Sequence, residues 1–190
     1  MIGTKNKGSL LMPEVYRKVM YYFFSFPQIS IGLSMLAKNI NSSKNATKES
    51  VEQLVSEGLL NKAIAGNSWI ISLNQKSPLL ISRKIPYNLQ MVYESGIIPT
   101  IYQKYPNANA IILFGSYRWG VDNESSDIDI AVEVTGSKFH IEEGSILKNL
   151  GYRKNVKVNM HIFSRKSTHI NLLTNIYNGI ILDGLLEIDK

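Results

Sequence analysis

The chain has 190 residues, 44% apolar side chains, a formal net charge of +6 and no cysteine. Without cysteine it can form no disulfide, and it offers neither a thiolate zinc site nor a cysteine nucleophile. No apolar run approaches the roughly 18–20 residues that span a bilayer, and the N-terminus lacks the long apolar core of a secretory signal. We therefore expect a soluble cytoplasmic protein that has no membrane partner.

The positive charge is concentrated in the N-terminal part of the chain. Residues 1–86 contain 11 Lys and Arg against 4 Asp and Glu, a net charge of +7, whereas residues 87–190 contain 10 against 11, a net charge of −1. This asymmetry predicts two domains, residues 1–86 and residues 87–190, with Pro78 and Pro86 near their junction. A basic domain indicates a polyanionic partner, although a solvated lysine-rich surface explains the charge equally well.

The N-terminal part is predicted to contain three helices and a hairpin. Residues 13–25 form the first helix, since a proline suits its first turn and another proline follows its end. Residues 30–40 place apolar side chains at helical spacing, and residues 46–60 do so again after Ser43, whose hydroxyl can cap the helix start. Two β-like runs flank residues 65–67, whose sequence Ala-Gly-Asn indicates a hairpin turn.

This order of elements resembles a winged helix-turn-helix domain, and residues 36–59 resemble the sequence pattern of that family. The resemblance covers roughly residues 10–75 and implies that the third helix enters the major groove of double-stranded DNA, where lysines neutralise phosphates and asparagine reads a base edge. The residues that it places against DNA are Lys44, Asn45, Thr47 and Lys48 on the helix and Lys62 and Asn67 in the wing. Glu49, Glu52 and Glu57 on the same helix would repel phosphate, so a winged helix that docks onto protein or forms a homodimer stays open as the alternative.

In the C-terminal part, residues 109–134 carry side chains suited to chemistry. The segment begins with a continuous apolar run that predicts a buried strand, and Gly115 and Ser116 follow where that strand ends. A glycine lets the backbone approach a ligand closely, and the serine hydroxyl beside it can donate to a phosphate. Asp127 and Asp129 then alternate with apolar residues, so both carboxylates lie on one face of a second strand. Unpaired carboxylates this close repel each other, and a shared divalent cation such as Mg2+ would remove the repulsion.

Together these residues resemble the signature of DNA polymerase beta-like nucleotidyltransferases, and most of all its minimal and kanamycin nucleotidyltransferase branch. The matching positions are Gly115, Ser116, Gly120, Ser126, Asp127 and Asp129. Over residues 105–185 the resemblance implies an α/β (α+β) domain in which helices pack on a mixed sheet. It also implies metal-dependent transfer of a nucleoside monophosphate from an NTP to a hydroxyl, with Mg2+ or Mn2+ on the two aspartates and the triphosphate on Gly115, Ser116 and Ser126. Arg118 is close enough in sequence to reach a phosphate, or else lies on the surface.

The third carboxylate that active members of this family supply from a later strand is missing. The corresponding strand, residues 155–163, has apolar residues on one side and Asn159 and His161 on the other. Asn159 is expected at the acidic position, although an amide cannot accept a proton and binds Mg2+ less well than a carboxylate. His161 either acts as a base, because its ordinary pKa is near ~6.5, or only forms a hydrogen bond. Glu133 shares the face of the aspartates but lies about 13 Å along the strand from Asp129.

Helices are expected for the remaining segments, namely an interrupted connecting helix at residues 87–104, another helix at residues 141–152 and a closing helix at residues 167–184. Three functions stay open. The first is the nucleotidyltransferase itself, acting on an NTP. The second is a DNA-binding regulator whose transferase fold has weak or no catalytic activity, and the third is an antitoxin-like protein that binds a helical partner protein.

Overall fold

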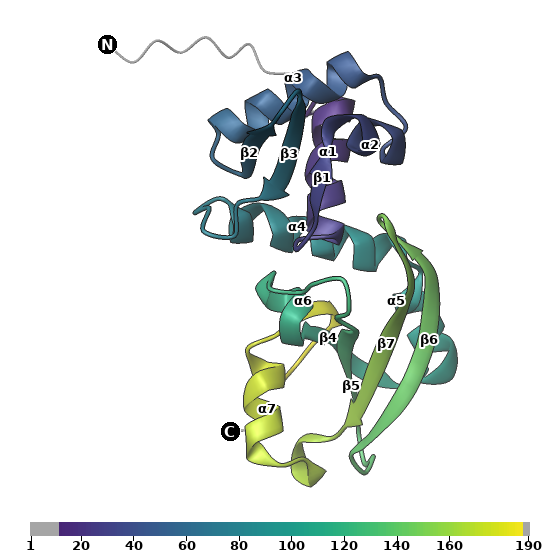
Figure 1. Cartoon of the computed structure of the whole chain (residues 1–190). Helices are drawn as coiled ribbons and strands as arrows, with labels where there is room; N and C mark the ends of the chain where they lie inside the picture. The colour runs from purple at the N-terminus through teal and green to yellow at the C-terminus, as the bar shows by residue number, and fades with distance from the viewer. Residues whose placement is uncertain (1–11, 188–190) are drawn as a thin grey trace. The chain divides into compact units, whose positions relative to one another are not determined.

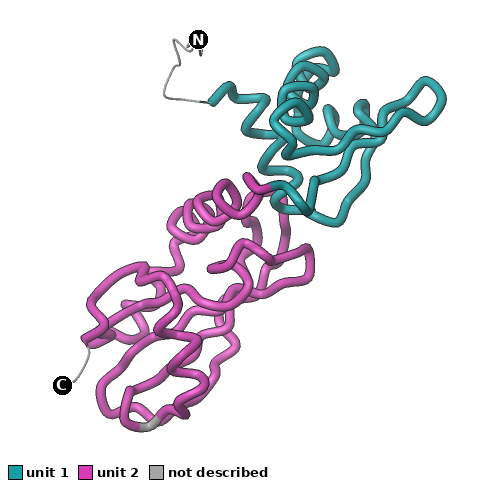
Figure 2. The backbone as a smooth tube through the Cα atoms, turned by 90° about the vertical axis from the view of Figure 1, so that its left-hand side faces the viewer, with its two compact units in different colours: residues 1–77 teal, residues 78–190 magenta. Residues whose placement is uncertain are grey.

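The computed structural model describes residues 12–187, and the chain divides into two compact units. One unit ends at Ser77 and the other begins at Pro78 (Figure 2). The boundary expected at Pro86 lies instead inside a helix, α4 (Leu80–Glu94). A proline inside a helix removes one backbone hydrogen bond, but α4 buries side chains both before and after it, including Lys84 and Tyr87. Packing on both sides of the proline therefore keeps the helix continuous.

The N-terminal unit combines three helices with a small antiparallel sheet (Figure 1). The sheet has the strand order β1-β3-β2, so the predicted hairpin of β2 and β3 is confirmed. Gly66 in its turn has φ +58°, a conformation that glycine adopts without steric cost. Ser43 caps α3 as expected, because its Oγ accepts a hydrogen bond from the Ala46 amide at 3.2 Å. The elements are α1 (Glu14–Ser25), β1 (Ser30–Gly32), α2 (Leu33–Asn39), α3 (Lys44–Ser56), β2 (Leu60–Ala65) and β3 (Ser68–Leu73).

The C-terminal unit is built on a five-stranded sheet with the order β6-β7-β5-β4-β8. The pair β5–β7 is parallel and the other pairs are antiparallel, which makes the sheet mixed, as the family resemblance implies. After α4, its elements are α5 (Ile97–Lys104), β4 (Ala108–Phe114), α6 (Gly115–Trp119), β5 (Ile128–Val134), β6 (His140–Leu150), β7 (Arg153–Phe163), a 3-10 turn (Arg165–Ser167), α7 (Ile170–Tyr177) and β8 (Ile180–Gly184).

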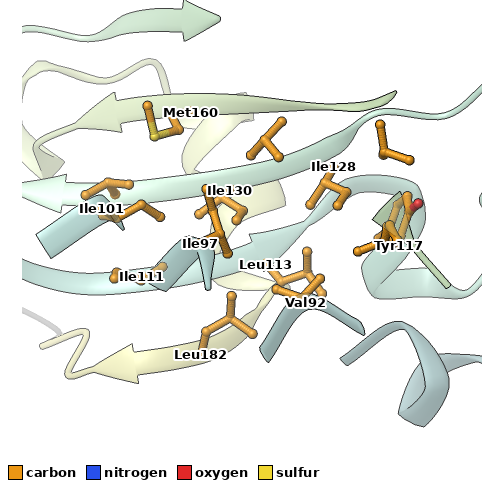
Figure 3. Close-up of a cluster of buried hydrophobic side chains, with 14 of the residues drawn as sticks. Val92, Ile97, Ile101, Ile111, Leu113, Tyr117, Ile128, Ile130, Met160 and Leu182 are labelled. Carbon is orange, nitrogen blue, oxygen red and sulfur yellow. The ribbon is translucent and has the colours of Figure 1, made fainter. Parts of the chain in front are cut away.

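Helices cover both faces of this sheet. On one face, Val92 of α4 and two isoleucines of α5 pack against the apolar side chains of β4, β5 and β7 (Figure 3). On the other face, Leu173 and Ile176 of α7 pack against β4 and β5. Side chains alternate between the two faces along β5. Ile128 and Ile130 point into the core under α4 and α5, so Asp129 and Ala131 point to the face that α7 covers. Asp127 and Asp129 therefore lie on the α7 face.

Of the segment 141–152, for which a helix is predicted, residues 151–152 form a turn and residues 141–150 form a strand. They belong to β6, which pairs antiparallel with β7. Gly144 shows why, since a Cβ placed on it would lie 2.4 Å from the Val158 carbonyl oxygen of β7. A glycine inside a helix is unfavourable, whereas inside a strand it permits such a close backbone approach. The isolated glycine was thus a signal in favour of a strand.

Glycines also mark the breaks in the other two segments with predicted helices, and for residues 87–104 the predicted interruption is found. The segment 87–104 divides between α4 and α5 at Gly96, which has φ +75°. The segment 167–184 contains α7 and then β8, with Gly179 packed so tightly that a Cβ would lie 2.4 Å from Ile112. Within residues 12–187, no helix has the length and apolar character needed to cross a membrane.

Candidate active site

A tight turn at the end of β4 brings the glycine–serine pair against the aspartate strand. β4 ends at Phe114, which is the register partner of Asp129 on β5. Gly115 follows with φ +70°, and a Cβ placed on it would lie 2.5 Å from Asp129 Oδ2. Any other residue would therefore displace the carboxylate or strain the backbone. Glycine at this position lets the turn lie directly beside Asp129.

Asp127 and Asp129 approach the same side chain of the neighbouring strand. β7 runs parallel to β5, and Asn159 is the register partner of Asp129. The amide Nδ2 of Asn159 lies 3.3 Å from Asp129 Oδ1 and 3.5 Å from Asp127 Oδ2. The two carboxylates thus converge on one point, with a neutral amide directly beside them.

His161 lies one step further along the same face of β7. Its Nε2 is 3.4 Å from Asp129 Oδ1, and its ring meets the Phe114 ring edge-on with 4.8 Å between centres. The side chain is only 12% exposed, and its buried Nδ1 has no hydrogen-bond partner in the described part of the chain. Glu133 is too far along β5 to join this group, and it is instead buried in an ion pair with Arg165 at 2.6 Å.

The donor set of the site suits a hard divalent cation. Asp127 and Asp129 are partly exposed, and no lysine or arginine within residues 12–187 forms an ion pair with either. Mg2+ is commonly held by one or two carboxylates together with oxygens of water and substrate phosphates. The described residues contain no group of three or more His, Cys, Asp or Glu arranged to hold a metal. A divalent ion on these two aspartates would therefore take its other oxygens from a bound phosphate or water.

The two serines of the motif have different surroundings. Ser116 is partly exposed in the turn after Gly115, where its hydroxyl can meet a ligand. Ser126 closes a local turn, since its Oγ accepts a hydrogen bond from the Asn123 amide at 3.0 Å. Because Ser126 directly precedes Asp127, this bond contributes to the position of the first carboxylate.

Arg118 has partners inside the C-terminal unit. Its guanidinium carbon lies 3.9 Å from the centre of the Trp119 ring, and its Nε donates to the Asn178 carbonyl at 2.6 Å. Trp119, Asn175 and Asn178 line a hollow of about 260 Å³ next to Gly115. Arg118 thus supports one wall of this hollow, and its contact with a phosphate stays a prediction.

A buried polar network holds the loop that joins the Gly115 turn to Asp127. The sequence analysis did not predict this network. Lys84 of α4 is 1% exposed and forms an ion pair with Asp122 Oδ1 at 3.2 Å. Asn88 Nδ2 donates to the same oxygen at 2.7 Å and to the Tyr117 carbonyl at 3.0 Å. Burial lowers the pKa of Lys84, and the Asp122 carboxylate opposes that shift. The partners are 29 to 38 residues apart, so no local pattern could reveal them.

Arg153 holds the other end of the same loop. It lies at the start of β7, is 7% exposed, and donates to the Ser126 carbonyl at 2.7 Å and to the Tyr117 hydroxyl. Burial raises the pKa of Tyr117, so its phenol stays protonated at neutral pH. The loop that joins the glycine turn to Asp127 is therefore anchored on the unit's core at both ends.

Several of the residues expected to face DNA gather in one place on the N-terminal unit. Lys44, Lys48 and Asn67 line a hollow of about 490 Å³ together with Trp69. Lys62 Nζ lies 4.2 Å from the centre of the Trp69 ring. Among the residues that the structure describes, none that lines this hollow is acidic, and two are lysines, so its charge is positive.

The expectation for Thr47 is wrong. Its side chain is fully buried, and its Oγ1 donates to the Ser43 carbonyl at 2.8 Å. Thr47 faces the core because it lies on the same side of α3 as Val51 and Leu54, one and two helical turns along. Asn45, by contrast, is exposed, as are Glu49 and Glu52.

Residues 97–183 match the family model described as Polymerase beta, Nucleotidyltransferase. The matched segment runs from the start of α5 into β8 and contains the Gly115 turn, both aspartates and Asn159. The match supports the nucleotidyltransferase family for this part of the chain. It does not extend to the N-terminal unit, and no curated protein matches the chain.

The buried ion pair gives a prediction about stability. Lys84→Met should lower the free energy of unfolding by about 3–5 kcal/mol, because it leaves the Asp122 carboxylate buried without its cation. The double variant Lys84→Met/Asp122→Asn should recover most of that loss, since it buries no unpaired charge. Urea unfolding followed by Trp119 fluorescence in a Trp69→Phe background reports on this unit alone. A loss below about 1 kcal/mol in Lys84→Met, as for an exposed pair, would contradict the prediction.

Proposed function

We propose that the C-terminal unit is a metal-dependent nucleotidyltransferase that moves a nucleoside monophosphate from an NTP to a hydroxyl acceptor. The observation that carries this proposal is the convergence of Asp127 and Asp129 beside the Gly115 turn, where their carboxylates lie 3.5 and 3.3 Å from one Asn159 nitrogen. The family match over residues 97–183 supports the same activity.

In this proposal the two aspartates hold the metal ion, and the turn at Gly115 and Ser116 holds the phosphates. Asp127 and Asp129 would bind Mg2+ or Mn2+, which when bound neutralises charge on the phosphates and on the leaving pyrophosphate. Gly115 lets the turn lie directly beside Asp129, and the hydroxyl of the adjoining Ser116 would donate to the phosphates. The acceptor oxygen bonds to the α-phosphorus as the bond to the β-phosphate oxygen breaks. Because the protein forms no covalent bond in this step, its contribution is positioning and charge neutralisation.

The acceptor hydroxyl must lose its proton, and the residues beside the aspartates differ in whether they can take it. Asn159 cannot, because an amide is not a base. The imidazole of His161 has a nitrogen that can accept a proton, but its Nε2 lies 3.4 Å from Asp129 Oδ1, which suits it to orient that carboxylate. The amide at position 159 favours the competing proposal, a site that binds nucleotide with weak or no catalysis.

Loss of either aspartate should abolish transfer. With α-labelled NTPs, Mg2+ and protein, RNA or small hydroxylated acceptors, Asp127→Ala and Asp129→Ala should each reduce labelling about 100-fold or more, because the phosphate charge is no longer neutralised. Glu94→Gln serves as the control, since Glu94 only accepts a hydrogen bond from Gln90 on the surface of α4. Labelling that persists in both aspartate variants would refute the enzyme, and nucleotide binding without labelling in the unaltered chain would favour the catalytically inactive protein.

We further propose that the N-terminal unit is a winged helix-turn-helix that binds double-stranded DNA through Lys44, Lys48, Lys62 and Asn67. The supporting observation is the basic hollow around Trp69, which brings lysines of α3 and of the hairpin together. Lys44 and Lys48 lie one helical turn apart and line this hollow. Glu52 follows Lys48 by one further turn and is not among the described residues that line it. Phosphate would therefore meet the flank of α3 next to the hairpin, with Asn45 available for a base edge.

Salt dependence tests this second proposal. Lys44→Ala/Lys48→Ala should weaken binding to a 30-base-pair duplex of mixed sequence and reduce the slope of log affinity against log salt by about 2, close to 0.9 for each lost phosphate contact. Fluorescence anisotropy between low and moderate salt measures both quantities. Lys18→Ala is the matched control, because its ammonium already pairs with Glu14 at 2.6 Å. An unchanged slope in the double variant would leave the unit as a protein-docking module.

A further inference from the structure

The register across three strands brings a carboxylate of β6 to the aspartate face. Asp129 pairs with Asn159 between β5 and β7, and Asn159 pairs with Glu143 between β7 and β6. Residues directly opposite each other on neighbouring strands point to the same face of a sheet. Glu143 therefore shares a face with Asp129 and lies on the far side of Asn159.

The preceding residue on β6 supports this orientation independently. Glu142 accepts a hydrogen bond from the Tyr105 hydroxyl at 2.6 Å and forms an ion pair with Lys104. Both partners lie at the end of α5, which covers the opposite face of the sheet. Because successive residues of a strand point to opposite faces, Glu143 must point to the face that carries Asp127 and Asp129.

A bulge sets the position of Glu143. Between Glu143 and Ile146 the register shifts, so β6 has one residue more than β7 at this point. Gly144 permits this geometry, since a Cβ there would lie 2.4 Å from the Val158 carbonyl oxygen. Bulges frequently occur next to active sites, where they redirect a side chain.

The spacing and the free carboxylate suit a metal ligand. Neighbouring strands lie ~4.8 Å apart, so the backbones of Asp129 and Glu143 are about 10 Å apart. Side chains that reach inward from both would hold divalent ions, which would supply charge neutralisation for the phosphates. Glu143 is exposed, and the described residues give it no hydrogen-bond or ion-pair partner. Since those residues hold no preformed three-ligand group, the Glu143 side chain would turn toward Asn159 when metal and nucleotide bind.

We propose that Glu143 supplies the third carboxylate of the site from β6, in place of the residue missing from β7. It binds the second divalent ion and takes the proton of the acceptor hydroxyl, while the acceptor oxygen bonds to the α-phosphorus and pyrophosphate leaves. The neutral amide of Asn159 then lies between two acidic groups, where a further carboxylate would add like-charge repulsion. This assignment rests on the nucleotidyltransferase function proposed above.

Counting bound Mn2+ tests the assignment without relying on turnover. The full chain is titrated with Mn2+ in the presence of the α,β-methylene analogue of each NTP in turn, and electron paramagnetic resonance measures the free ion. Two Mn2+ should bind to the unaltered chain with at least one analogue. Glu143→Gln should keep the first ion and weaken the second about 10-fold or more, and Glu143→Gln/Asn159→Asp should restore the second ion by moving the carboxylate to β7.

Glu142→Gln is the matched control, since it removes the neighbouring carboxylate from the opposite face, and both ions should still bind. Under turnover, Glu143→Gln should lower kcat about 100-fold or more while the KM for NTP changes little. If the second Mn2+ binds equally well to Glu143→Gln and to the unaltered chain, the assignment of Glu143 is overturned, whereas the nucleotidyltransferase proposal stands. Absence of any nucleotide-dependent Mn2+ binding in the unaltered chain, together with no labelling, would overturn the nucleotidyltransferase proposal as well.

Discussion

The chemistry available to the C-terminal unit depends on the parallel pairing of β5 with β7. Ile128 and Ile130 of β5 oppose Val158 and Met160 of β7, and all four are buried in the core under α4 and α5. Because side chains alternate between the faces of a sheet, burial of this apolar set forces the polar set onto the other face, and a slip of one residue would reverse both. The same apolar contacts that stabilise the sheet therefore also decide which polar groups meet Asp129.

The polar groups of the C-terminal unit have two different environments. Behind the site, Lys84, Asp122, Asn88 and Arg153 are buried, and their charges are paired or hydrogen-bonded. Within the site, Asp127 and Asp129 stay partly exposed and meet only long contacts with an amide and an imidazole. The charged groups of the buried network are paired, although the Asn88 Oδ1 has no hydrogen-bond partner in the described residues. Carboxylates with free lone pairs, by contrast, retain capacity for a cation. The structure thus combines an anchored loop with two carboxylates that keep free lone pairs, an arrangement that the proposed metal-dependent transferase would need.

The sequence predicted those features that depend on near neighbours. The alternation around Asp127 and Asp129, the glycine turn after the apolar strand and the hairpin of the N-terminal unit all follow from patterns of a few residues. The Lys84–Asp122 pair could not be predicted, because it depends on packing between segments 38 residues apart. Thr47 lies in the core and not on a DNA-facing surface, because its Oγ1 donates to the backbone of its own helix, which satisfies the hydroxyl when it is buried. The segment 141–152 was ambiguous, because its apolar residues fit a helix while Gly144 fits a strand.

That ambiguity matters for function more than any other. On a helix, successive residues differ by about 100° in direction, and neither Glu142 nor Glu143 would have a defined relation to Asn159. On a strand, the two glutamates are separated onto opposite faces: Glu142 binds Tyr105 and Lys104 at the end of α5, and Glu143 is left opposite Asn159 without a partner in the described residues. The absence of an acidic residue at position 159 is therefore not by itself a loss of the third carboxylate. In the proposed site the third carboxylate comes from β6, the strand beside β7. The bulge at Gly144 is the local feature that brings Glu143 opposite Asn159.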